Sequence, residues 1–209
     1  MREDNLKIQK NEGKISKRIY PIITNFFKNC KDGKILDIGC GNGNLSNRLL
    51  NMGFVIFGCD IFKNIDKKGI NYNKVDLNIG ILPYKNNYFD YVTCIEVIEH
   101  LENPRTIIKE ISRVLKPKGM LILSTPNITS LPQKIYFLLT NNFLHFYFPS
   151  VLYGHITPIN LGMLKDTFLK NKLEIHQITY DRGWIPLLRV NMPKNNLFGD
   201  LMIIKLKKI

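Results

Sequence analysis

The chain has 209 residues, enough for one α/β domain with a full core and too few for two ordinary domains. Its 44% hydrophobic and 22% charged residues argue against a disordered protein. No apolar stretch follows the charged N-terminus MREDNLKIQK, so no signal peptide is expected, and no uninterrupted apolar run has the length of a membrane span. The formal net charge of +13 comes from basic residues scattered along the chain. We expect a cytoplasmic protein.

Short apolar runs alternate with helical patterns in the first part of the chain. Apolar positions at helical spacing predict a helix over about residues 15–29. The run KILDI, residues 34–38, is bounded by turn residues and is typical of a buried parallel strand. A second helix is expected from Leu45 to near Gly53, followed by a strand over residues 54–59.

The middle of the chain continues this alternation. We predict a third strand leading into Val75 and a fourth over residues 89–95. Asn103 followed by Pro104 is a favourable helix start, because a capping side chain precedes proline at the first helical position. One apolar stripe follows, and we expect this helix to end at Pro117 and Gly119 and a fifth strand to cover residues 120–123.

The last third of the chain differs, since two strand candidates follow one helix. The helix is expected over residues 161–169 and the strands over residues 173–180 and 201–206, as an antiparallel pair at the sheet edge. The whole order predicts a Rossmann-like, doubly wound α/β fold with a mostly parallel sheet and helices on both faces. We divide this single domain into four parts. These are a cover helix (residues 1–32), a cofactor-binding core (33–127), a lid with the acceptor region (128–159), and a final helix with the strand pair (160–209).

A glycine-rich loop joins the first strand to the first core helix. Gly39, Gly41 and Gly43 allow a sharp turn and close approach of the backbone to a ligand. This G-x-G-x-G spacing differs from the G-x-G-x-x-G of dinucleotide enzymes, whose third glycine would fall at Asn44. Asp37 precedes the loop, and its carboxylate suits an ammonium group better than a pyrophosphate. The loop therefore favours a cationic cofactor.

Two further acids follow the next two strands. Asp60 closes the second strand, where doubly wound nucleotide binders place a carboxylate that accepts both ribose hydroxyls. Asp76 follows the third strand and could accept a hydrogen bond from an adenine amino group, with Leu77 packed on the ring. Each acid alone is more often a surface carboxylate, but three at successive strand ends favour a nucleotide-containing cofactor.

These motifs, in this order, resemble class I S-adenosylmethionine-dependent methyltransferases. The likeness is strongest to the group that contains the ubiquinone-biosynthesis O-methyltransferases and glycan-modifying relatives, and it covers about two thirds of the chain. It rests on ILDIGCGNGNLS (35–46), the acid of GCDI (58–61), VDLN (75–78), LPY (82–84), FDYVTCIEVIEHLENP (89–104) and GMLILSTPN (119–127).

The resemblance implies a seven-stranded sheet with an antiparallel last strand and S-adenosylmethionine as cofactor. It also assigns residues to parts of the cofactor. Asp37 and the three loop glycines would hold the methionine end, Asp60 the ribose, and Asp76 with Leu77 the adenine, while Glu96 would line the site with its backbone. Cys40 and Ile61 complete the expected cofactor contacts. No metal site is expected, because the four cysteines form no C-x-x-C pair and are interpreted as buried, reduced thiols.

The region after the fifth strand is expected to form a lid over the acceptor. It is rich in aromatic residues and ends in a G-H-x-T-P turn, which resembles glycan-associated methyltransferases. We predict His155 as the general base for a hydroxyl acceptor, although a structural role in this turn is equally compatible. His100 could lie near the acceptor or pack in a helix. Aromatic residues 136–147 could touch a membrane, but core and lid packing is favoured.

We therefore expect O-methylation of a small-molecule or cell-surface saccharide acceptor. The positive charge keeps a tRNA methyltransferase as the first alternative, although no Asn-Pro-Pro-Tyr-type motif is present. A NAD-binding oxidoreductase is opposed by Asp37 and by the missing third glycine. A noncatalytic binding protein is less compatible with the intact set of acids.

Overall fold

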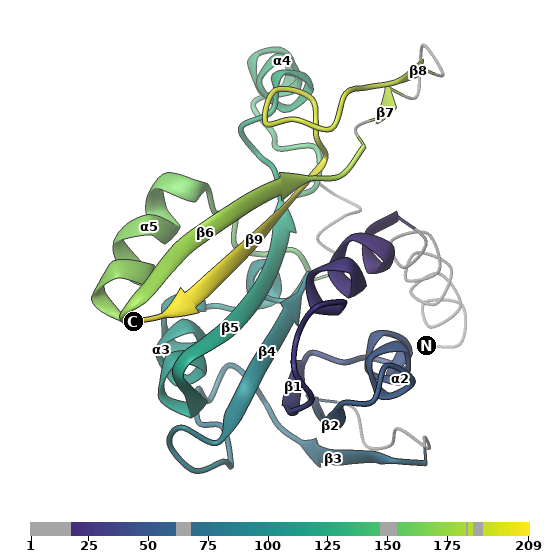
Figure 1. Cartoon of the computed structure of the whole chain (residues 1–209). Coiled ribbons are helices and arrows are strands. Elements are labelled where there is room, and N and C mark those ends of the chain that lie inside the picture. The colour runs from purple at the N-terminus through teal and green to yellow at the C-terminus, as the bar shows by residue number, and fades with distance from the viewer. Residues whose placement is uncertain (1–17, 62–67, 147–153, 183, 186–189) are drawn as a thin grey trace, which may run out of the picture.

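The computed structural model describes residues 18–61, 68–146, 154–182, 184–185 and 190–209, and for residues 184–185 and 190–191 the backbone alone (Figure 1). Residues 1–17 of the expected cover helix and residues 147–153 of the expected lid lie outside these ranges. Residues 62–67, which follow the second strand, also lie outside them. A seven-stranded sheet in the order β3-β2-β1-β4-β5-β9-β6 dominates the described part. Its strands are β1 Lys34–Ile38, β2 Val55–Asp60, β3 Ile70–Lys74, β4 Phe89–Ile95, β5 Leu115–Pro126, β6 Leu173–Tyr180 and β9 Leu201–Lys208.

The sheet has the predicted topology. Strand β9 is antiparallel to both of its neighbours, β5 and β6, and the neighbouring pairs among β1 to β5 are all parallel. Strands β6 and β9 form the expected antiparallel pair, with β6 outermost. The short strands β7 Trp184–Ile185 and β8 Val190–Asn191 pair separately. Strand β1 lies between β2 and β4, so the strand order reverses at β1. Folds of this type bind ligands at the carboxyl end of the strands at such a switch point.

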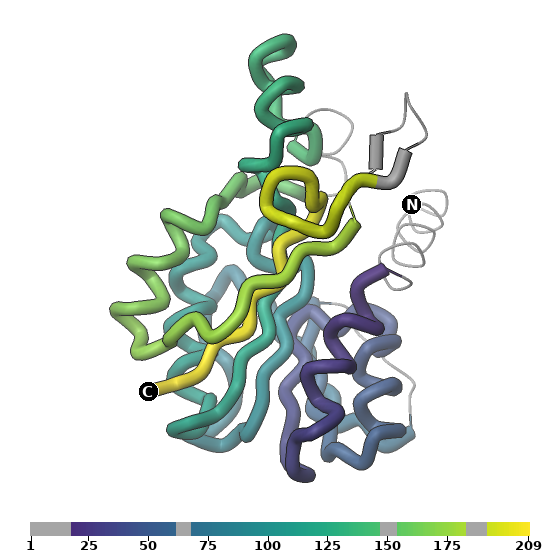
Figure 2. Tube along the Cα trace, turned by 45° about the horizontal axis from the view of Figure 1, so that its top comes forward, coloured from purple at the N-terminus to yellow at the C-terminus, as the bar shows by residue number. Residues whose placement is uncertain are grey.

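Helices cover both faces of the sheet (Figures 1 and 2). One face packs against α3 Pro104–Val114 and α5 Leu161–Lys170, and the other against the helix of residues 18–27 and α2 Asn44–Leu50. The alternation of side chains along a strand separates the two cores: Leu36 belongs to the first and its neighbour Ile35 to the second.

Helix α3 begins as the sequence predicts. The Asn103 side chain accepts a hydrogen bond from the Arg105 amide at 3.2 Å, and Pro104 occupies the first turn. The helix ends before Pro117, as expected: it stops at Val114, and β5 starts at Leu115, earlier than the strand expected over residues 120–123. Proline has no amide hydrogen and its ring clashes with the carbonyl four residues earlier, so the helix ends before it.

Helix α4, Leu131–Thr140, replaces the irregular start of the expected lid. It projects beyond the sheet in Figure 1. Its polar Gln133 is 2% exposed, whereas Leu138 and Leu139 are 80% and 79% exposed. The expected packing of this aromatic and apolar stretch is therefore wrong for α4, whose apolar side chains face outward. In the described part of the chain, no helix has the length and apolar character needed to span a bilayer.

Candidate active site

The glycine loop between β1 and α2 has the backbone that the sequence predicts. Gly39, Gly41 and Gly43 have φ angles of +65°, +49° and +66°, a left-handed region that other residues rarely adopt. A side chain at Gly39 would place its Cβ atom 2.3 Å from the Cγ2 atom of Val97. The Gly39 amide donates to the carbonyl of Cys59 at 2.8 Å, so the loop is held against the end of β2.

Asp37 lies under this loop and is only 2% exposed. Its Oδ2 atom accepts a hydrogen bond from Ser46 Oγ at 2.5 Å, and its Oδ1 atom accepts one from Thr93 Oγ1 at 2.7 Å. Burial raises the pKa of Asp37 to about 6, although both hydrogen bonds oppose that shift. The carboxylate therefore joins β1, α2 and β4. Sequence reasoning missed Ser46 and Thr93, because polar residues in a helix or strand carry no pattern that identifies their partners.

Asp60 connects the second strand to the glycine loop. Its Oδ2 atom accepts a hydrogen bond from the Gly41 amide at 2.8 Å, and its side chain is mostly buried. Tyr72 donates to the backbone carbonyl of Asp60 at 3.1 Å, a contact that the sequence did not indicate. Ile61, the next residue, is 53% exposed. The Cys40 thiol instead points toward β2, with Sγ 3.5 Å from the Cys59 carbonyl oxygen, and burial raises its pKa.

The third acid lies beyond β3. Asp76 is half-buried, and its Oδ1 atom accepts a hydrogen bond from the Asn78 amide at 2.9 Å. Leu77 is also half-buried and packs against the core on the α3 side of the sheet. Both residues follow β3 at the carboxyl edge of the sheet, where β1 and β2 also end.

Glu96 follows β4 in an unusual backbone conformation. Its φ angle is +55°, which is strained for a residue with a side chain. Ser124 holds this conformation, because its hydroxyl donates to Glu96 Oε1 at 2.7 Å and accepts from the Glu96 amide at 3.1 Å. Burial raises the pKa of Glu96 to about 7. The strain occurs beside the glycine loop, where a ligand would approach the backbone.

Next to Glu96, the short helix Ile98–His100 brings two further polar side chains to the same edge. Glu99 is fully buried, and its Oε2 atom accepts a hydrogen bond from Thr125 Oγ1 at 3.2 Å. Its Oε1 atom has no hydrogen-bond partner among the described residues. Burial, and then the charge of Glu96, raise the pKa of Glu99 well above its usual range. Sequence reasoning missed Glu99, whose burial cannot be read from the chain.

The predicted base His155 meets this helix from the lid. Its ring lies 4.6 Å from the ring of His100, edge to face, and its Nδ1 atom lies 3.0 Å from the carbonyl oxygen of His145. Burial, and then the neighbouring His100, lower the pKa of His155 to about 4. The imidazole is therefore neutral at neutral pH, but it is a weaker base than the sequence led us to expect.

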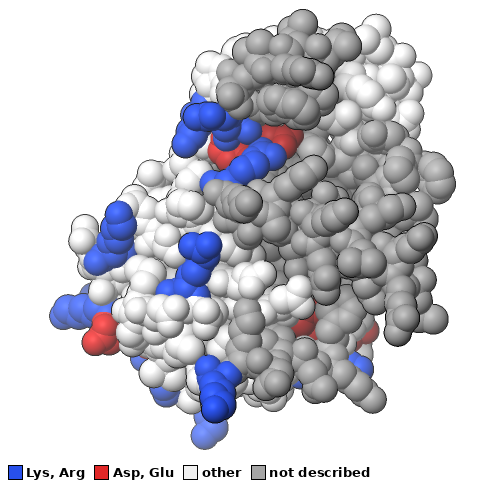
Figure 3. Space-filling view, turned by 90° about the vertical axis from the view of Figure 1, so that its right-hand side faces the viewer, with Lys and Arg blue, Asp and Glu red and all other residues white. Residues whose placement is uncertain are grey.

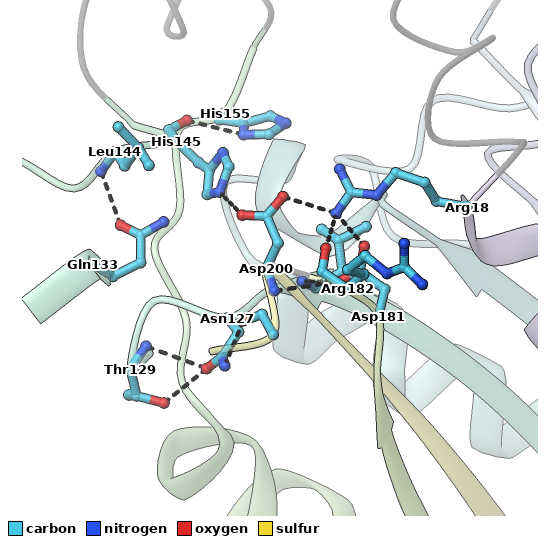
Figure 4. A network of polar contacts seen from close by, with 12 residues as sticks. Arg18, Asn127, Thr129, Gln133, Leu144, His145, His155, Asp181, Arg182 and Asp200 are labelled. Carbon is cyan, nitrogen blue, oxygen red and sulfur yellow. Dashed lines mark hydrogen bonds and ion pairs between the residues drawn. The ribbon is translucent and has the colours of Figure 1, made fainter. Parts of the chain in front are cut away.

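A polar network connects the lid with the first described helix (Figure 4). His145 Nε2 lies 2.9 Å from Asp200 Oδ1, and Arg18 donates to Asp200 Oδ2 at 3.0 Å. Arg18 also pairs with the buried Asp181. Burial lowers the pKa of His145, but its hydrogen bond and attraction to Asp200 outweigh burial and raise it overall. Sequence reasoning identified none of these contacts, which join residues more than 50 positions apart.

Comparison with known proteins identifies the family. A family model described as a methyltransferase domain matches residues 12–178, most of the chain. The chain belongs to this methyltransferase family. The methyltransferase is an enzyme whose cofactor is S-adenosylmethionine. That cofactor carries positive charge on its sulfonium and ammonium groups, and acids follow or end four neighbouring strands at the carboxyl edge, which suits those charges.

Two relatives show how far the likeness extends. The methyltransferase is 33% identical to the ubiquinone biosynthesis O-methyltransferase of Coxiella burnetii in an alignment of 105 positions that covers 46% of this chain and 45% of that protein. It is 40% identical to an uncharacterized protein of Methanocaldococcus jannaschii over 124 residues, 59% of this chain and 52% of that protein. The chain thus spans about half the length of these relatives.

A solved structure supports the fold over nearly the whole chain. It is the crystal structure of a possible histamine N-methyltransferase from Thermotoga maritima, with a TM-score of 0.70 and 18% identity. The likeness covers 98% of this methyltransferase and 96% of that chain. At this identity it shows the shared fold alone.

Proposed function

We propose that this methyltransferase methylates an oxygen atom of a small-molecule or saccharide acceptor. The observation that carries the proposal is the group of Glu99, His100 and His155, which adjoins Glu96 at the carboxyl edge of the sheet. Such side chains can orient a hydroxyl and hold its proton. The ubiquinone biosynthesis O-methyltransferase of Coxiella burnetii, to which 46% of the chain is similar, supports oxygen as the acceptor atom.

The cofactor would be held along the carboxyl edge. Asp37 would attract the ammonium group of the methionine end, and the backbone of the glycine loop, residues 39–43, would pass beside it. Asp60 would accept hydrogen bonds from the ribose hydroxyls, and its bond from the Gly41 amide would keep the carboxylate oriented. Asp76 and Leu77 would receive the adenine. Glu96 would line the site with its strained backbone, and Ile61 and Cys40 would complete the contacts.

When bound, S-adenosylmethionine supplies an electrophilic methyl carbon on a sulfonium sulfur. The chain's part is to align the acceptor oxygen and to exclude water. His155 Nδ1–H donates to the His145 carbonyl, so Nε2 carries the lone pair that can accept a proton from the acceptor hydroxyl. Because the pKa of His155 is low, this base acts late, as the hydroxyl becomes more acidic during methyl transfer.

Calorimetry with S-adenosylmethionine, S-adenosylhomocysteine and NAD tests the cofactor assignment to these residues. We expect the first two to bind and NAD not to bind. A panel of hydroxylated aromatic compounds, saccharides and tRNA, with mass spectrometry of the product, then tests the acceptor. An O-methyl product from a small molecule or saccharide supports the proposal, whereas methylation of tRNA alone contradicts it.

A nucleic-acid acceptor remains the second candidate because of the net charge of +13. On the face shown in Figure 3, however, the described Lys and Arg side chains stand mostly apart, with uncharged surface between them. A continuous basic surface would be expected for a bound phosphate backbone. Specific tRNA binding that weakens steeply with salt would favour this candidate over the small-molecule acceptor.

A further inference from the structure

We propose that Glu99, His100 and His155 bind one divalent transition-metal ion, of the class that includes Zn²⁺ and Co²⁺. One potential ligand atom from each residue lies within 4.8 Å of the other two. Bonds of about 2.0–2.2 Å place the ligands of one tetrahedral ion roughly 3.3–3.6 Å apart, so these side chains need to close by at most about 1.5 Å, which a change of side-chain rotamer supplies. This differs from the sequence-based expectation that no metal site is present.

Each of the two histidine rings has a hydrogen bond to the backbone. His155 Nδ1 hydrogen-bonds to the His145 carbonyl at 3.0 Å, and the His100 ring hydrogen-bonds to the backbone of Gly154. Metal-binding histidines characteristically donate one ring N–H to a carbonyl or carboxylate, which fixes the tautomer and directs the other nitrogen at the ion. Both rings in this group therefore have one nitrogen engaged by backbone and one directed elsewhere.

Glu99 supplies an independent observation that points to a ligand. Its side chain is fully buried, yet Oε1 has no hydrogen-bond partner among the described residues. A buried carboxyl oxygen without a partner carries a free-energy cost, and a cation held between Glu99 and the two histidines would satisfy that oxygen. Thr125 holds the other oxygen, Oε2, so the carboxylate is fixed in orientation. Two imidazoles and one carboxylate favour a transition metal over Mg²⁺ or Ca²⁺, which prefer oxygen ligands.

The role of the ion in catalysis rests on the proposed function, whereas the binding of the ion does not. Three protein ligands leave a coordination position open, as in catalytic metal sites. The oxygen of the acceptor would occupy that position, where a divalent ion lowers the pKa of a hydroxyl. In that case His155 is a ligand instead of a base, and oxygen acceptors are preferred.

The test is titration of the chelator-treated full chain with Co²⁺, followed by visible absorption, with Zn²⁺ as competitor. We expect one site per chain. Removing a residue that only hydrogen-bonds to a metal ligand lowers metal affinity by about 10–100-fold. Glu99→Gln and His155→Ala each remove a proposed ligand itself, so each should weaken binding at least ten-fold. His176→Ala, which removes a half-exposed histidine from β6, is the matched control and should bind as the parent does.

A measurement on the parent protein keeps the test valid if a variant fails to fold. In NMR spectra of the histidine rings, Zn²⁺ should shift the signals of His100 and His155 and leave that of His176 unchanged. Absence of Co²⁺ binding, or equal binding by both variants, overturns the proposal. If S-adenosylhomocysteine still binds in that case, the metal site alone is rejected; if it does not bind, the proposed function fails as well.

Discussion

In the proposed cofactor site, Asp37 is the residue on which we expect binding to depend most. Its carboxylate is buried, and burial raises its pKa to about 6. Only the ionised form attracts the ammonium group of the cofactor. A raised pKa means that the carboxylate gains its proton as the pH falls through 6, so the attraction is present above that pH and lost below it.

We therefore predict that the affinity for S-adenosylhomocysteine falls below pH 6, by up to about ten-fold per pH unit. Asp37→Asn should bind more weakly than the parent at pH 8, and its affinity should lose this pH dependence. Calorimetry between pH 5 and 8 measures both. Asp32→Asn removes the same charge from an exposed side chain before β1 and serves as control. Equal affinity of Asp37→Asn and the parent at pH 8 would remove Asp37 from the cofactor site.

Among the elements, α3 and α4 differ most in what their apolar side chains do. Ile108 of α3 is fully buried against the sheet, whereas Leu138 of α4 is 80% exposed. The apolar residues of α3 recur at helical spacing, whereas residues 135–139 of α4 form one continuous apolar run, which does not indicate which side of the helix is buried.

Alanine substitution should reveal this difference in stability. Ile108→Ala leaves a cavity in the core and should lower the free energy of unfolding by about 2–5 kcal/mol. Leu138→Ala should change it by no more than about 0.5 kcal/mol, because the side chain has little buried area to lose. Urea unfolding of the two variants beside the parent is the measurement. A large loss in Leu138→Ala would show that α4 is covered in solution.

At the scale of the whole molecule, Arg18 connects the helix of residues 18–27 to the edge of the sheet formed by β6 and β9. It pairs with Asp181 at the end of β6 and with Asp200 before β9, and Asp200 in turn binds His145. Asp181 is 1% exposed, so removal of its cation would leave a buried carboxylate with fewer partners.

Arg18→Ala should therefore lower the free energy of unfolding by about 1–3 kcal/mol, reduced from the cost of a fully buried pair because Arg18 is 37% exposed. Arg182→Ala, which removes the same charge from an exposed neighbour of Asp181, is the control and should have little effect. Chemical unfolding at pH 7 compares the two. If Arg18→Ala lowers the free energy of unfolding as little as Arg182→Ala does, the ion pairs of Arg18 in Figure 4 add nothing to stability.

The local pattern of the chain was sufficient for the fold and for the cofactor loop. Apolar alternation and helical spacing predicted the seven strands and α3, since these signals arise within a few residues of one another. The left-handed conformation of Gly39 and its two partners also follows from residue type and spacing. For the same reason, the position of Asp37 and Asp60 at strand ends could be inferred from the sequence.

Only the tertiary structure decided what surrounds those residues. It brought Thr93 to Asp37, buried Glu99 with one oxygen that has no hydrogen-bond partner in the described part of the chain, placed His155 against His100, and turned apolar side chains of α4 outward. Burial and long-range contact depend on how all elements pack, and a residue's sequence neighbours carry no record of that packing. The sequence by itself thus determined the type of fold and the class of cofactor, while the packed chain determined the pKa values and brought Glu99, His100 and His155 together.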